Sequence, residues 1–197
     1  MKQLILLLAT GTSLLFSQGY KVGDNVKDFS LKNVDGKMVS MADYKDAKGF
    51  IVVFTCNHCP FAIAYEQRIM ALDVKFRPLG YLVIAINPND PAIVPDDSFD
   101  NMVLRSKEKG YSFPYVLDET QEIAKTFGAT KTPHVYIVSK SQNKMTVEYI
   151  GAIDNNTDDA SKADKKYVEL AVDALLSGKS FDNKETKAVG CGIKWKK

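Results

Sequence analysis

Two cysteines separated by two residues, Cys56 and Cys59, constrain most strongly what this chain can fold into. They follow the apolar run of residues 50–54 and precede Pro60, after which apolar residues recur at spacings of three and four. A continuous apolar run is typical of a strand that is covered on both faces, and the later spacing is that of an amphipathic helix. The cysteine pair is therefore predicted where a buried strand gives way to a helix.

This position predicts a redox role for the pair. The first turn of a helix offers unpaired N–H groups and about half a positive charge, so the pKa of Cys56 is expected below its ordinary value. Cys56 would attack a disulfide, and Cys59 would then resolve the mixed disulfide. His58, when protonated, would favour the reduced form and make the disulfide more oxidising. A static disulfide and a metal site are the alternatives for this pair.

A second feature is the dipeptide formed by Thr132 and Pro133, which opens a predicted strand after a helix that ends at Gly128. Together with the upstream Cys-x-x-Cys, it indicates that Pro133 is a cis-proline facing the cysteine pair. The backbone of Thr132 would then be free to pair with an extended substrate.

The rest of the pattern predicts one α/β domain with no internal repeat. Strands at residues 50–54 and 81–86, joined by the helix after Pro60, form a parallel unit. The proline- and aspartate-rich residues 87–97 form a loop at the edge of the site. The other expected elements are a hairpin at 26–40, a helix from Ser98, a strand at 113–117, a helix capped by Asp118 with Gln121, strands at 134–139 and 146–150, and a last helix capped by Ser161.

The N-terminus has the pattern of an export signal. Lys2 is followed by an apolar run at residues 4–16 and by small or polar residues at 17–19. We expect a signal peptide at residues 1–18, with a domain at residues 19–197 in the periplasm or another extracytoplasmic compartment. Contact with the membrane is expected only during export, and no cysteine lies near this zone for lipid attachment. The alternative is an N-terminal core strand or helix.

The composition adds limits of its own. The chain has 197 residues, 45% of them hydrophobic, and a formal charge of +2 with no aromatic-plus-basic stripe, which argues against nucleic acid as a partner. Its three cysteines are too few for a structural disulfide framework, so one working pair and one further thiol are expected. Cys191 is either a third redox thiol or an idle cysteine.

Several short motifs are spread over nearly the whole chain after residue 18. They are Val22-Gly23-Asp24, Asp28-Phe29-Ser30-Leu31, Asp35-Gly36-Lys37, Asn57-His58-Cys59-Pro60-Phe61, Ala85-Ile86-Asn87-Pro88-Asn89-Asp90, Phe113-Pro114-Tyr115, Leu117-Asp118-Glu119-Thr120-Gln121 and Gly190-Cys191-Gly192-Ile193-Lys194-Trp195. Taken together, these motifs resemble a peroxiredoxin-like branch of the redoxin or thiol-specific antioxidant (alkyl hydroperoxide reductase-like) group. The resemblance implies a thioredoxin-like fold: a central mixed β-sheet flanked by helices, with an N-terminal hairpin and a C-terminal extension.

The first functional hypothesis is therefore an exported thiol–disulfide oxidoreductase that cycles Cys56 and Cys59 without a cofactor. Its partners would be thiols and disulfides of proteins or small molecules and an unknown reductant. A thiol-dependent peroxidase of the antioxidant type is the alternative, although Val53 stands where a peroxiredoxin has threonine or serine and the last arginine is Arg105. A copper- or zinc-binding chaperone is the second alternative, because Cys56, Cys59, His58 and His134 could supply ligands.

Overall fold

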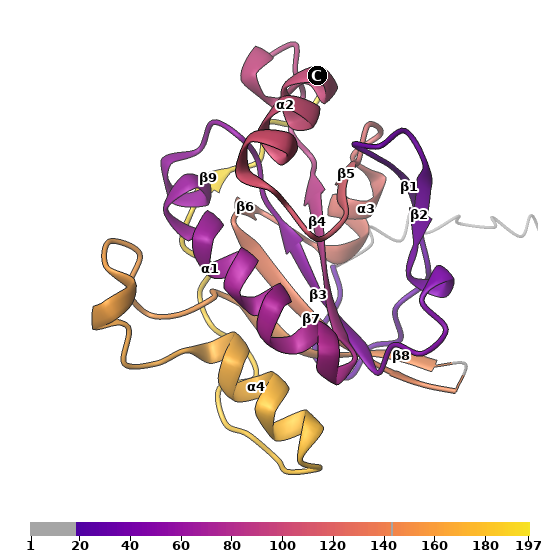
Figure 1. Ribbon diagram of the computed structural model, residues 1–197, viewed down its shortest axis with the longest axis vertical. Helices are drawn as coiled ribbons and strands as arrows, with labels where there is room; N and C mark the ends of the chain where they lie inside the picture. Colours follow the sequence, from indigo (N-terminus) through magenta and orange to yellow (C-terminus); the bar gives the residue numbers. More distant parts are fainter. Residues whose placement is uncertain (1–18, 143) are drawn as a thin grey trace, which may run out of the picture.

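The computed structural model describes residues 19–142 and 144–197 (Figure 1). The predicted signal peptide at residues 1–18 lies outside them. A seven-stranded sheet in the order β2-β1-β5-β4-β3-β7-β8 forms the centre of the fold. Its strands are β1 (Ser30–Asn33), β2 (Met38–Ser40), β3 (Gly49–Phe54), β4 (Tyr81–Asn87), β5 (Tyr115–Leu117), β7 (His134–Ser141) and β8 (Lys144–Gly151).

The sheet is mixed, as the sequence predicts. β4 runs parallel to β3 and to β5, and the remaining neighbours pair antiparallel. Four α-helices lie among the described residues: α1 (Pro60–Phe76), α2 (Phe99–Lys109), α3 (Glu122–Phe127) and α4 (Tyr167–Leu176). Short 3-10 helices are η1 (Met41–Asp43), η2 (Arg77–Leu79), η3 (Pro95–Asp97) and η4 (Ala160–Lys162). None of the helices in the described part of the chain is both long and apolar enough to cross a membrane.

Helices cover both faces of the sheet, so the central strand β3 is buried on both sides. Successive side chains of a strand point to opposite faces. Ile51 and Val53 pack with residues of α1 and α4, which lie together on one face (Figure 1). Phe50, Val52 and Phe54 pack with residues of α3 on the other face. This packing holds the end of β3, and the residues that follow it, in one position.

Three local predictions need correction. β5 begins at Tyr115, two residues later than expected, and α4 begins at Tyr167 rather than after a Ser161 cap. Ser161 lies in η4, where its backbone N–H donates to the side chain of Asp159. Asp118 does cap α3, since it accepts from the backbone of Ala124 at 2.7 Å. Gln121 does not complete that cap, because its side chain binds the C-terminal segment instead.

A second, two-stranded sheet was not predicted from the sequence. It consists of β6 (Lys131–Thr132) and β9 (Cys191–Gly192), which pair antiparallel. β9 comes from the far end of the chain and lies beside the start of α1 (Figure 1). The C-terminal extension therefore passes beside the cysteine pair.

Candidate functional site

The site lies at the junction between β3 and α1. β3 ends at Phe54, and α1 begins at Pro60, a residue that the first helical position tolerates because its missing N–H is not needed there. Cys59 is the N-cap residue of α1, and Cys56 lies in the segment between the end of β3 and this N-cap. The predicted strand-to-helix position of both cysteines is confirmed.

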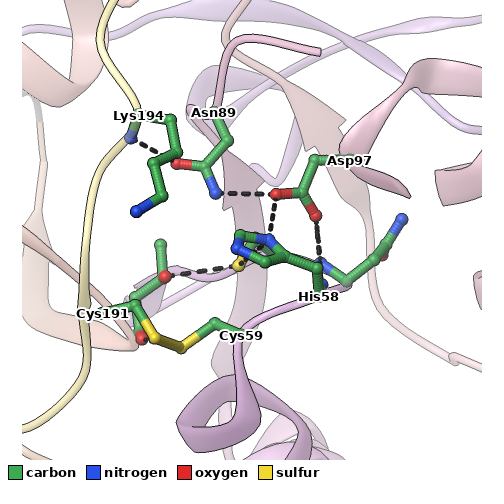
Figure 2. The surroundings of a disulfide bond; sticks show 9 residues. His58, Cys59, Asn89, Asp97, Cys191 and Lys194 are labelled. Carbon is green, nitrogen blue, oxygen red and sulfur yellow. Dashed lines mark hydrogen bonds and ion pairs between the residues drawn. A yellow bond between two sulfur atoms is a disulfide. The ribbon is translucent and has the colours of Figure 1, made fainter. Parts of the chain in front are cut away.

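The disulfide of the site differs from the expected one. Cys59 is bonded to Cys191, with their Cα atoms 6.1 Å apart, and Cys56 is a free thiol (Figure 2). The strand β9 was not predicted from the sequence, and it is β9 that carries Cys191 to the first turn of α1. A Cys56–Cys59 disulfide at another step of a redox cycle stays a prediction.

The thiol of Cys56 is enclosed by polar groups. Its Sγ lies 3.3 Å from the hydroxyl oxygen of Thr132 and 3.7 Å from Nδ1 of His58. The same Nδ1 lies 2.6 Å from Oδ2 of Asp97, and the side chain of His58 keeps 23% of its surface exposed. The imidazole of His58 therefore contacts the thiol of Cys56 and the buried carboxylate of Asp97, and it is also partly exposed to solvent.

Asp97 is the residue that sequence reasoning missed. Its side chain is fully buried, and its Oδ1 accepts from the backbone N–H groups of Asn57 and His58 at 2.7 and 3.2 Å. Its Oδ2 accepts from Asn89 at 2.8 Å and contacts His58 (Figure 2). The sequence did place the loop at residues 87–97 at the edge of the site. This loop contains three aspartates, and nothing in the sequence distinguishes Asp97 from the other two.

The pKa of Cys56 contradicts the sequence prediction of an acidic thiol. Burial, first, and the negative charge of Asp97, second, raise the pKa of Cys56 to about 11. The backbone N–H groups of Cys59 and His58 lower it, which is the predicted effect of the helix terminus, but they are outweighed. Cys56 is only 6% exposed, so the loss of hydration dominates.

This shift predicts an unusual pH profile for the alkylation of Cys56 by iodoacetamide in the oxidised protein. With a pKa of about 11, the thiolate fraction at pH 7 is about 10⁻⁴, against about 3% for an ordinary thiol. The alkylation rate, followed by mass spectrometry, should rise about tenfold per pH unit up to at least pH 10. The urea-unfolded protein is the control, and a folded-state midpoint at or below about 8.5 would contradict the prediction.

The proline of the site is as predicted. The peptide bond between Thr132 and Pro133 is cis. Thr132 contacts both sulfurs of the predicted pair, because its carbonyl oxygen lies 3.1 Å from Sγ of Cys59 and its hydroxyl lies beside Cys56. The Thr132 backbone is not free, however, since β9 already pairs with it.

Comparisons with known proteins place the chain in a family. The sequence profile of the AhpC/TSA family matches residues 22–150. The chain belongs to the AhpC/TSA family. It is 36% identical to an uncharacterized conserved protein of Geobacillus kaustophilus, whose crystal structure superposes with a TM-score of 0.82 over 89% of this chain and 93% of that one.

Two further relatives carry names. The chain is 24% identical over 147 residues to the thiol-disulfide oxidoreductase ResA of Bacillus cereus. The aligned region covers 70% of this chain and 79% of that protein. A thiol:disulfide interchange protein of the thioredoxin family from Chlorobium tepidum has 21% identity, a TM-score of 0.52, and coverage of 66% of this chain and 87% of that one. This likeness shows the fold, and the predicted thioredoxin-like fold is confirmed.

In this AhpC/TSA member the last arginine of the chain is paired with a carboxylate. Arg105 lies on α2, and its Nε donates to Oε1 of Glu66 at 2.7 Å. Both Arg105 and His58 line an open groove of about 410 Å³ on one side of the site. The guanidinium therefore lines the groove that reaches His58 while it is paired with the buried carboxylate of Glu66.

The fold gathers two of the four metal ligands suggested by the sequence, Cys56 and His58, and not the other two. Cys59 is bound in the disulfide, and His134 is buried, accepts from the backbone of Thr130 at 3.3 Å, and has its pKa lowered to about 4 by burial. The ligand atoms of Cys56, His58 and Asp97 instead lie within 4.8 Å of one another. Sulfur, nitrogen and oxygen donors suit zinc or copper, but here the imidazole and the carboxylate bind each other directly.

Proposed function

We propose that this protein is a thiol–disulfide oxidoreductase in which Cys56 is the nucleophile and Cys59 the cysteine that it exchanges with. The observation that carries the proposal is that the free thiol of Cys56 and the disulfide-bonded sulfur of Cys59 both lie next to Thr132. Sγ of Cys56 lies 3.3 Å from the Thr132 hydroxyl, and Sγ of Cys59 lies 3.1 Å from the Thr132 carbonyl oxygen. The name of the ResA relative supports the same chemistry.

His58 gives Cys56 a route to ionise. Its Nδ1 lies between the thiol and the carboxylate of Asp97 and donates its proton to that carboxylate, so it cannot take the thiol proton itself. When Nε2 is protonated as well, the positive charge of the imidazolium stabilises the thiolate that forms when Cys56 loses its proton to solvent. This assistance matters because the unassisted thiol has a pKa of about 11. Proximity also compensates for a small thiolate fraction, since attack within one site needs no encounter between molecules.

Cys191 takes part as the third redox thiol. It holds Cys59 in the oxidised state, and it is more exposed than the two other cysteines, which are 6% and 0% exposed at Cys56 and Cys59. Thr132 and Pro133 position an extended substrate next to the pair once the Thr132 backbone is available. We include export in the proposal because Lys2 and the apolar run at residues 4–16 have the pattern of a signal peptide.

The proposal is tested by catalysis with dithiothreitol as donor and insulin as disulfide substrate. Acceleration of insulin precipitation beyond dithiothreitol alone is expected, and no acceleration, together with no oxidation of a reduced peptide, would overturn the oxidoreductase assignment. In a parallel assay, dithiothreitol consumption that requires hydrogen peroxide would instead identify a thiol peroxidase. An N-terminal sequence of the secreted protein that begins near Gly19 is expected if it is exported.

A further inference from the structure

The C-terminal strap, residues 190–196, is bound to the body of the protein along its length. β9 pairs with β6 in the register Thr132 to Cys191 and Lys131 to Gly192. The following N–H of Ile193 donates to the carbonyl of Thr130 at 3.3 Å. The strap thus continues as a strand along the segment that leads into Pro133.

The outer part of the strap is held by two side chains. Gln121 donates from Nε2 to the carbonyl of Lys194 at 2.8 Å and accepts from the N–H of Lys196 at 2.7 Å. The N–H of Lys194 donates to Oδ1 of Asn89 at 2.9 Å. Ile193 is buried in the same core cluster that Trp195 packs against. The strap is therefore a docked element and not a loose end.

Gly190 shows how closely the strap approaches the proline turn. A Cβ atom at this position would lie 2.3 Å from the carbonyl oxygen of Thr132 and 3.0 Å from the nitrogen of Pro133. Both atoms belong to the backbone, so they cannot move aside as a flexible side chain could. Gly192 differs, because a Cβ there would meet nothing within 4 Å. The chain offers a matched pair of positions for testing the fit.

The docked strap closes the site. It uses the backbone of Lys131 and Thr132, which is the strand edge that an extended substrate would need. With the strap in place, Cys56 is 6% and Cys59 0% exposed, and Cys191 packs directly against the cluster that they form. A polypeptide substrate cannot reach either sulfur in this state.

Asn89 connects the strap to the ionising groups of the site. Its Oδ1 accepts from the strap at Lys194, and its Nδ2 donates to Oδ2 of Asp97 at 2.8 Å (Figure 2). The same carboxylate oxygen contacts His58, which contacts Cys56. If the strap departs, Oδ1 of Asn89 loses the N–H of Lys194 that donates to it. Cys56 also loses part of the burial that raises its pKa.

We propose that the C-terminal strap occupies the strand edge at Lys131 and Thr132 with which an extended substrate would otherwise pair. The Cys59–Cys191 disulfide holds the strap there, and breaking that bond releases it. The inference rests on the proposed function for the identity of the competing substrate. In exchange, the thiolate of Cys56 forms a bond to Sγ of Cys59, the Cys59–Cys191 bond breaks, and Cys191 leaves as a thiolate that takes up a proton. An external dithiol breaks the same bond by supplying two electrons and two protons and becomes a disulfide.

Trp195 reports on the strap directly because it is the one tryptophan in the sequence and lies within the strap. In the oxidised full-length protein we expect its fluorescence to be protected from acrylamide. Reduction with a phosphine should shift the emission to the red and increase the quenching. Equal quenching in both states would overturn the proposal, whether or not the protein catalyses exchange with insulin.

Two sets of variants complete the test. Cys191→Ser removes the fastening, so its quenching should no longer depend on redox state and should match the reduced wild type. Gly190→Ala should increase both Trp195 quenching and Cys56 alkylation in the oxidised protein, whereas Gly192→Ala should behave as wild type. Identical behaviour of the two glycine variants would contradict the close fit of the strap at Thr132.

Discussion

Replacing Cys56 with serine is expected to abolish exchange with disulfide substrates. A serine hydroxyl does not ionise at neutral pH, so the rate of dithiothreitol-dependent insulin reduction should fall by roughly 10³-fold or more. The variant should also retain a single oxidised form, because the Cys59–Cys191 bond can no longer be exchanged within the site. Peptide mapping of the alkylated, unreduced protein measures this second result.

The control for Cys56→Ser is Cys191→Ser, which keeps both members of the predicted pair. It should form a Cys56–Cys59 disulfide on oxidation and exchange with insulin far faster than Cys56→Ser, but more slowly than the wild type because the third redox thiol is missing. If Cys56→Ser remained active while Cys59→Ser did not, the nucleophile would be Cys59, and the roles assigned to the two cysteines would have to be reversed.

The sequence was informative wherever function depends on residues that are close together in the chain. The apolar run before Cys56 and the helical spacing after Pro60 predicted the strand-to-helix junction, and β3 and α1 have those positions. The cis peptide bond before Pro133 was also predicted, from its combination with the cysteine pair. The junction follows from local rules of periodicity and helix termini, whereas the cis bond was inferred by combining two motifs that are distant in the chain.

Contacts between residues that are far apart in the chain could not be predicted from the sequence in the same way. Cys191 is separated from Cys59 by 132 residues, and the two-residue strand β9 has no periodicity that would predict its pairing with β6. Asp97 was one of several acidic residues in a loop, and only the fold shows that it, and not Asp96, is buried. Gln121 was read as a capping residue because its contacts with the strap depend on the same unpredicted segment.

The pKa of Cys56 was mispredicted for a related reason. A helix terminus stabilises a thiolate that can still be hydrated, and sequence cannot say whether solvent reaches the sulfur. Here the strap contributes to a closed site in which burial outweighs the backbone N–H groups. Opening of the strap would restore part of this hydration and so weaken the first of the two causes that raise the pKa of Cys56.

Replacing Asp97 with alanine is expected to have the largest effect on stability. The backbone N–H groups of Asn57 and His58, together with the His58 imidazole, would lose their acceptor. Leaving a buried donor without an acceptor lowers the free energy of unfolding by about 1–3 kcal/mol for each such group, which denaturant titration measures. Asp96→Ala is the matched control, because this neighbouring side chain is exposed.

The same variant separates a positioning role from a purely structural one. The charge of Asp97 raises the pKa of Cys56, so its removal should move the pH profile of Cys56 alkylation toward lower pH. Asp97→Asn removes the charge but keeps an oxygen that can accept from Asn57, so it should shift the profile with a smaller loss of stability. An unchanged profile in both variants, with stability lost, would mean that Asp97 only supports the loop and does not act on the thiol.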